Sequence, residues 1–239
     1  MEKIMTYENL RRFAYVNDGV CEKPVRGIVI SFFGLGGMEM YPEDTYEGRF
    51  YGERGILYVV PYNNPWAWMN RQAVSYTDEV LDVLMAEYGL GGDIPIVSTG
   101  GSMGGQSALV YMVYAKRTPV ACVVNCPVCD VVYHYTERED LPRTLYSAVA
   151  HEEGGLEEAL RAISPLHLAE KMPDAVYHIF HCEEDEAVNK KLHSDLFVET
   201  MRQRGHVVSY DAVPGRGHCD LTEPMRELYK EYILDAVRR

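Results

Sequence analysis

Basic residues are scarce in this sequence of 239 residues. Lys and Arg together number 23 against 36 Asp and Glu, which gives a formal net charge of −13 at pH 7. An excess of negative charge repels phosphate backbones and anionic lipid surfaces. Nucleic acids and membrane surfaces are therefore not expected as partners.

Long hydrophobic runs are also missing. No apolar stretch approaches the ~18 residues that a membrane-spanning helix needs. The N-terminal segment MEKIMTYENLRRF has no continuous apolar core of the kind found in secretion signals. These two features predict a cytoplasmic protein that does not enter the membrane.

Cysteine is sparse, with six residues in the chain. Because the sequence shows no secretion signal, we expect free thiols and no disulfide framework. Cys126 and Cys129 form a C-P-V-C spacing that suits zinc or a redox pair, but no second such pair and no histidine pair at ligand spacing accompanies it. The sequence therefore indicates neither a metal nor another cofactor.

Short apolar runs rich in β-branched residues alternate with longer stretches of helical period. This alternation predicts an α/β fold in which a mostly parallel central sheet is flanked by helices on both faces. A hydrophobic share of 47% and a length of 239 residues suit one large domain, residues 1–239. Strands are expected at 26–32, 56–60, 94–99, 120–125, 175–181 and 207–212, with a weaker one at 13–16. Helices are expected at 72–88, 103–116, 187–204 and 223–237.

Residues 130–173 interrupt this alternation. They contain several helical fragments and separate two strands by some forty positions, more than a compact connection needs. We interpret the segment as an inserted helical cap, with a plain surface excursion as the alternative.

A serine stands at the junction of a strand and a helix. The sequence STGGSMGG contains G-x-S-x-G at Gly100, Ser102 and Gly104, directly after an apolar strand. On such a sharp turn, small flanking residues let the helix approach the neighbouring strands. The helix that begins behind Ser102 directs free backbone N–H groups at the reacting centre, and Met103 N–H is the expected oxyanion donor. The sequence lacks the spacing of a phosphate-binding loop, so Ser102 is the predicted nucleophile.

With this motif the chain resembles an α/β-hydrolase from about residue 26 to its end. The segment FFGLGG at 32–37 is similar to the H-G-x-G-G oxyanion loop of that family, with Phe33 where histidine is common. The resemblance implies that the backbone N–H of Leu35 is the second oxyanion donor.

The same resemblance implies an acid and a base. HCEEDEAV at 181–188 is similar to a strand end of the form H-G-x-x-D-x-x-V, which makes Asp185 the acid; Glu184 and Glu183 remain alternatives. PGRGH at 214–218 stands at the family's base position and makes His218 the base. A neutral imidazole can take the serine proton if a carboxylate fixes its tautomer.

The resemblance extends to esterases and to prolyl-oligopeptidase-like hydrolases. It implies a serine hydrolase, with a carboxylic ester as the preferred small-molecule substrate and an amide or peptide bond as the second choice. Acyl transfer to another acceptor, or binding without catalysis, are further alternatives. Trp66 and Trp68 follow a strand on the side where such sheets bind ligands, which makes them candidate substrate-binding residues. The alternative is that they pack under the cap. Tyr133, His134 and Tyr135 are weaker candidates. The oligomeric state is left open.

Overall fold

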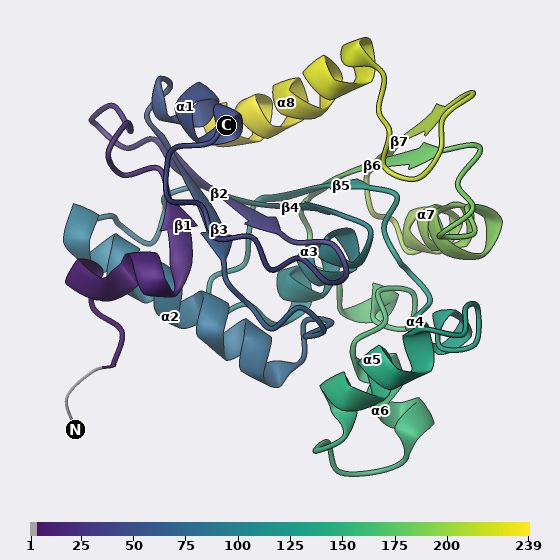
Figure 1. Cartoon of the computed structure of the whole chain (residues 1–239). Helices are drawn as coiled ribbons and strands as arrows, with labels where there is room; N and C mark the ends of the chain where they lie inside the picture. Colours follow the sequence, from purple (N-terminus) through teal and green to yellow (C-terminus); the bar gives the residue numbers. More distant parts are fainter. Residues whose placement is uncertain (1–3) are drawn as a thin grey trace.

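The computed structural model describes residues 4–239 and contains one seven-stranded sheet (Figure 1). The strands are β1 (Ala14–Val16), β2 (Gly27–Phe32), β3 (Ile56–Pro61), β4 (Ile96–Gly101), β5 (Ala121–Asn125), β6 (Val176–Cys182) and β7 (Val208–Val213). Their order is β1-β3-β2-β4-β5-β6-β7. β1 runs antiparallel to β3, and all other neighbours are parallel.

Helices cover both faces of the sheet. The α-helices are α1 (Tyr46–Gly52), α2 (Arg71–Tyr88), α3 (Met103–Tyr114), α4 (Val131–His134), α5 (Leu141–Val149), α6 (Leu156–Ala162), α7 (Leu196–Gln203) and α8 (Glu223–Arg238). Short segments of other helical types are η1 (Tyr7–Arg12), η2 (Ala169–Lys171) and η3 (Lys191–Asp195). None of the helices within residues 4–239 is both long enough and apolar enough to cross a membrane.

The alternation of side chains along each strand builds two separate cores. Ile28 and Ile30 of β2 pack in the larger core with residues of α2, α3 and α7. Val29, between them, packs in the other core, where α1 and α8 supply Tyr51 and Ile233. Successive strand residues point to opposite faces, so a strand covered on both sides is apolar at every position. Figure 1 shows α1 and α8 on one side of the sheet and α2 and α3 on the other.

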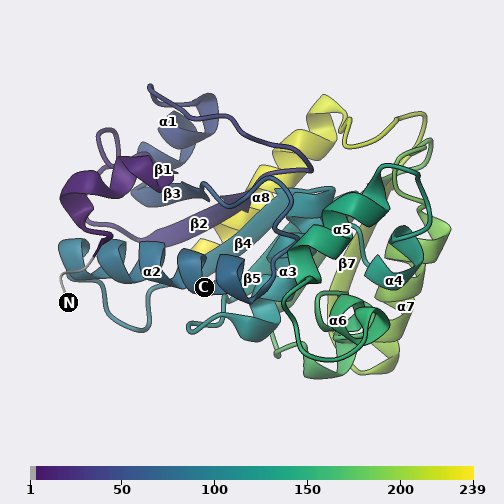
Figure 2. The same cartoon turned by 60° about the horizontal axis from the view of Figure 1, so that its bottom comes forward.

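Residues 130–173 form α4, α5, α6 and η2 between β5 and β6. Figure 2 shows these helices grouped together beside one end of the sheet. A third apolar cluster joins them to the rest of the chain, since Leu141, Leu145 and Leu160 pack in it with Trp68 and Met103. Trp68 Nε1 also donates to Thr144 Oγ1 at 3.1 Å. The segment is thus packed against the loop that follows β3 and against the first residue of α3.

The sequence prediction agrees with the sheet. All seven expected strands are present, and their ends differ from the predicted ones by no more than two residues. The expected helix at 187–204 is shorter: residues 187–190 are irregular, η3 follows, and α7 begins only at Leu196. The backbone N–H groups of Ala187 and Val188 donate to the Asp185 carboxylate, which holds this stretch in a turn. The prediction also lacked α1 and η1.

Candidate functional site

The loops that carry the predicted site residues all leave the same edge of the sheet. The carboxyl ends of β2, β4, β6 and β7 lead into Leu35, Ser102, Asp185 and His218, respectively. Because these strands are parallel, their carboxyl ends meet at one edge, where open α/β sheets bind ligands. A cavity of about 630 Å³ lies there and is lined by Leu35, Ser102 and His218, among others.

Ser102 has the backbone of a strained turn. Its φ of 58° and ψ of −126° lie in a region that non-glycine residues rarely occupy. Its N–H donates to the carbonyl of Asn125 at 3.0 Å, and its own carbonyl accepts from Gln106 N–H at 3.1 Å, so the turn is tied to β5 and to α3. The side chain is thereby presented at the point where β4 ends and α3 begins.

Glycine at 100 and 104 is required by space. A Cβ on Gly104 would lie 2.1 Å from the carbonyl oxygen of Phe32, and a Cβ on Gly100 would lie 2.3 Å from the carbonyl oxygen of Gly104. Real Cβ atoms do not approach backbone oxygen so closely. The glycines of the G-x-S-x-G motif therefore let α3 sit against β2 and β4, as the sequence analysis expected.

Two backbone N–H groups are available near Ser102. Met103 is the first residue of α3, so its N–H has no acceptor one turn earlier in the helix. Leu35 N–H donates to no backbone or side-chain acceptor within residues 4–239, and Leu35 lines the cavity. The positive end of the α3 dipole adds to the field at this position. Both predicted oxyanion donors are thus located at the same end of the sheet.

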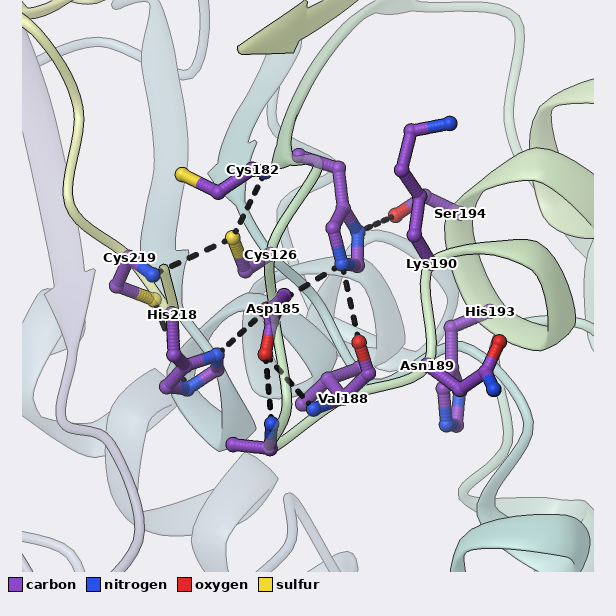
Figure 3. A network of polar contacts seen from close by, with 12 residues as sticks. Cys126, Cys182, Asp185, Val188, Asn189, Lys190, His193, Ser194, His218 and Cys219 are labelled. Carbon is purple, nitrogen blue, oxygen red and sulfur yellow. Dashed lines mark hydrogen bonds and ion pairs between the residues drawn. The ribbon is translucent and has the colours of Figure 1, made fainter. Parts of the chain in front are cut away.

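Asp185 and His218 are joined by a hydrogen bond. His218 Nδ1 donates to Asp185 Oδ2 at 2.7 Å (Figure 3). The other carboxylate oxygen, Oδ1, accepts from the backbone N–H groups of Ala187 and Val188, both at 2.9 Å. These contacts fix the carboxylate and the tautomer of His218 whose Nε2 carries the lone pair. The alternative acids Glu183 and Glu184 are exposed, and neither is bonded to His218.

A second histidine supports the same carboxylate. His181 is fully buried on β6, and its Nε2 lies 3.3 Å from Asp185 Oδ2, while its Nδ1 lies 2.6 Å from Ser194 Oγ. Burial opposes the charge of Asp185, but the hydrogen bonds from His181, His218 and Val188 outweigh it and hold the pKa of this carboxyl well below its usual range. By contrast, His178 stacks on Tyr232 with ring centroids 3.7 Å apart and belongs to the core around α8.

The charge on Asp185 changes the titration of His218. Burial favours the neutral imidazole, but the hydrogen bond and charge of Asp185 favour the imidazolium more strongly and raise the pKa of His218 to about 9. His218 is only partly buried, with 28% of its side chain exposed, so it reaches the cavity from the loop after β7.

Three cysteines surround this pair, a feature that sequence spacing alone did not reveal. Cys126 Sγ accepts from the backbone N–H groups of Cys182 and Cys219, both at 3.4 Å (Figure 3). Cys219 Sγ lies 3.8 Å from His218 Nε2 and also lines the cavity. Cys129, the partner of Cys126 in the C-P-V-C spacing, is directed elsewhere, toward the carbonyl of Pro127. All six cysteines are free thiols.

The two tryptophans have different positions. Trp68 is 1% exposed and lines the cavity, and its ring contacts that of His134 at a centroid distance of 5.6 Å. Trp66 is not among the residues that line the cavity; the guanidinium of Arg143 lies over its ring at 5.4 Å. The structure thus brings Trp68, but not Trp66, to the wall of the cavity.

The model of the prolyl oligopeptidase family matches residues 60–233, which is most of the chain and includes Ser102, Asp185 and His218. The chain belongs to the prolyl oligopeptidase family. It is a hydrolase of the α/β-hydrolase type, with the mostly parallel sheet that this fold requires. Among curated proteins, a search finds no match.

Solved structures with the same fold include two hydrolases and an esterase. A puromycin hydrolase is 18% identical to this chain, with a TM-score of 0.73. The match covers 90% of this chain and 34% of the puromycin hydrolase. An S-formylglutathione hydrolase from Agrobacterium tumefaciens is 16% identical with a TM-score of 0.71, and the match covers 95% of this chain and 88% of that hydrolase. The esterase Est2 from Thermogutta terrifontis is 18% identical with a TM-score of 0.65, and the match covers 93% of this chain and 86% of the esterase. The chain spans about a third of the puromycin hydrolase and most of the other two.

Proposed function

We propose that this protein hydrolyses carboxylic esters through an acyl-enzyme on Ser102, with His218 as base and Asp185 as the acid that orients it. The observation that carries the proposal is the 2.7 Å hydrogen bond between Asp185 and His218 beside the strained turn at Ser102, with both His218 and Ser102 lining one cavity. A nucleophile, a base and an orienting carboxylate in this relation are the parts that acyl transfer needs.

In the first half of the reaction, Ser102 Oγ attacks the ester carbonyl carbon and its proton passes to His218 Nε2. The carbonyl oxygen becomes an oxyanion that accepts hydrogen bonds from Met103 and Leu35 N–H. When the tetrahedral intermediate collapses, the bond to the leaving alkoxide breaks and His218 returns the proton to it. The alcohol leaves, and the acyl group stays on Ser102.

In the second half, His218 takes a proton from water, and the resulting hydroxide attacks the acyl carbonyl. Collapse of the second intermediate releases the carboxylic acid and returns the proton to Ser102. Asp185 remains ionised throughout and stabilises the imidazolium that forms in both halves. The depressed pKa of Asp185 supports this role, since the carboxyl keeps its charge across the neutral range.

We also propose that residues 130–173 serve as a cap that shapes the substrate cavity. His134, Arg138 and Asp140 of this segment line the same cavity as Leu35 and Ser102. The single-domain organisation and the cytoplasmic location expected from the sequence remain proposals of the same kind, and no cofactor is needed for the steps given above.

A fluorophosphonate probe tests the nucleophile. The probe should label the wild-type chain at Ser102, as located by peptide mass spectrometry, and leave Ser102→Ala unlabelled. Ser107→Ala is a matched control, because Ser107 is buried on α3 and bonded to Gln106. An unmodified Ser102 under saturating probe would reject the proposal.

A peptidase or amidase activity is the second candidate, and the family match favours it. Ester and amide cleavage use the same groups, so the choice depends on substrate fit. Turnover of short-chain and aromatic p-nitrophenyl esters should be compared with that of proline-containing p-nitroanilides. A higher kcat/KM for the anilides would make an amide, not an ester, the proposed substrate. Transfer of the acyl group to a competing alcohol would reveal acyltransferase activity.

A further inference from the structure

A second hydrogen-bonded series of histidine and carboxylate side chains leads from the backbone to the wall of the cavity. Glu137 Oε2 lies 2.9 Å from His193 Nε2 and 2.6 Å from His134 Nδ1. Both histidines are buried, at 0% and 2% exposure. His134 lines the cavity that contains Ser102 and His218, whereas Glu137 and His193 lie behind it. The proposed hydrolysis uses none of these three groups.

The backbone determines where the proton of His193 lies. The N–H groups of Cys129 and Asp130 both donate to His193 Nδ1 at 3.1 Å, so this nitrogen carries a lone pair. A neutral imidazole has one N–H and one acceptor nitrogen, which places the N–H of His193 on Nε2. His193 therefore donates to Glu137 Oε2.

The carboxylate then determines the proton of His134. Burial raises the cost of a charge on Glu137, but hydrogen bonds from His134, His193 and the backbone N–H of Asn189 outweigh it and hold the pKa of Glu137 well below its usual range. An ionised carboxylate only accepts hydrogen bonds. His134 must therefore donate from Nδ1, and any lone pair on its ring lies at Nε2.

Nε2 of His134 has no hydrogen-bond partner within the described part of the chain. Burial lowers the pKa of His134, despite the opposing effect of Glu137, so the ring is neutral at pH 7 and Nε2 is an acceptor. The other polar groups of the cap in the cavity wall satisfy each other, because Arg138 donates to both carboxylate oxygens of Asp140.

His134, Glu137 and His193 also have the donor set of a metal site. Metal binding at His193 would use Nε2, since Nδ1 is occupied by two backbone N–H groups. The ring would then lose its last proton and become an imidazolate, which is costly in a buried site. The hydrogen bonds therefore indicate that Glu137 and His193 orient His134, and they disfavour a cation site at these three side chains.

We propose that His134 Nε2 accepts a hydrogen bond from the substrate, so that the cavity selects esters or amides that carry a hydroxyl or amino N–H donor away from the scissile bond. This inference rests on the hydrolase function proposed above and names its substrate class. An analogue without the donor leaves the acceptor unpaired when it is bound, and sites built around a hydrogen bond discriminate strongly against such analogues.

Paired substrates test the proposal. Each pair has a hydroxylated ester and its deoxy counterpart: p-nitrophenyl 2-hydroxybutyrate and 3-hydroxybutyrate against the butyrate, and 3-(hydroxymethyl)phenyl butyrate against phenyl butyrate. We expect the wild type to prefer at least one hydroxylated ester by about tenfold in kcat/KM. In His134→Phe the preference should fall to about onefold, because kcat/KM falls more for the hydroxylated esters than for their deoxy counterparts.

The two proposals fail in different ways in this experiment. Absence of turnover for every ester, including the deoxy ones, would contradict ester hydrolysis itself. Turnover of the deoxy esters without any preference, or with a preference that survives in His134→Phe, would overturn only the role of His134.

Nuclear magnetic resonance of the wild-type chain gives a second readout that does not depend on the folding of a variant. With ¹⁵N-labelled histidine, His134 should be the neutral Nδ1–H tautomer at pH 7.5, and His193 the Nε2–H tautomer. A His134 that is protonated at Nε2, alone or on both nitrogens, would overturn the proposal because the acceptor would be missing.

Discussion

At the scale of the residue, the position of one proton on His218 controls the proposed chemistry. The base must be neutral to accept the Ser102 proton, and the same carboxylate that orients the ring also favours its charged form. Since Asp185 Oδ1 is held by two backbone N–H groups and Oδ2 faces both His218 and His181, the carboxylate cannot turn away from the ring without losing other bonds.

The pH dependence of the activity follows from this arrangement. Because the pKa of His218 is raised from 6.5 to about 9, a protonated and inactive fraction persists above neutral pH. We therefore expect kcat/KM for a p-nitrophenyl ester to rise with pH through the range from 7 to 9, and the rate of fluorophosphonate labelling to follow it. A pH-rate profile that is already flat at pH 6.5 would contradict the raised pKa.

Substitution of the acid provides the matched control for that profile. Asp185→Asn removes the charge and the tautomer control, so kcat/KM should fall by about 10⁴-fold, and the remaining activity should rise at lower pH than in the wild type. Glu184→Gln removes a charge one position away, at an exposed side chain, and should leave both the rate and the profile nearly unchanged. The opposite ranking would transfer the role of the acid to Glu184.

At the scale of the element, the sequence predicted those strands and turns that are determined by residues close together in the chain. The central strands β2 and β5 are mostly apolar because both of their faces are buried, so the runs at 26–32 and 120–125 were visible without tertiary information. The strand-to-helix turn at Ser102 was equally visible, since its glycines are adjacent in sequence. Asp185 was implied by the resemblance of residues 181–188 to the family pattern H-G-x-x-D-x-x-V, and the structure locates it beside His218.

Other features depend on contacts between distant segments and could not be predicted from the sequence. His134 and His193 are far apart along the chain and meet only because η3 packs beside the cap, with Glu137 between them. Cys126 and Cys219 likewise come together from β5 and from the loop after β7. The first turn of the expected helix at 187–204 was lost to hydrogen bonds with Asp185, a competing tertiary interaction.

A hydrogen bond between α5 and the loop after β3 holds the cap in place. Trp68 Nε1 donates to Thr144 Oγ1 in a buried position, and Thr144→Val would remove the acceptor while keeping the shape of the side chain. We expect the free energy of unfolding to fall by about 1–3 kcal/mol, because a buried N–H is left without a partner. Urea denaturation followed by tryptophan fluorescence measures the change.

A control for this substitution lies in the same segment. Thr136 is exposed, and its hydroxyl donates only to the carbonyl of Tyr133 nearby, so Thr136→Val should change the free energy of unfolding by less than about 0.5 kcal/mol. Equal effects of the two substitutions would show that the Trp68 hydrogen bond does not stabilise the cap.

At the scale of the whole molecule, the site exists because four loops leave the same edge of one sheet. The order β3-β2-β4 places the oxyanion loop after β2 directly beside the Ser102 turn after β4. On the other side, β6 and β7 deliver the acid and the base as neighbours. The distance between these two halves depends on how closely α3 packs on the sheet, since α3 begins at the residue after Ser102.

This dependence predicts that a single methyl group at Gly104 damages both stability and activity. In Gly104→Ala the new Cβ would lie 2.1 Å from the carbonyl oxygen of Phe32, a backbone atom that cannot move without shifting β2 or α3. We expect a loss of at least about 3 kcal/mol in the free energy of unfolding, and a loss of ester hydrolysis in the fraction that remains folded. Gly92→Ala is the matched control: its Cβ would have no atom within 4 Å, so stability should change by less than about 0.5 kcal/mol. A stable and fully active Gly104→Ala would mean that the approach of α3 to β2 does not set the geometry of the site.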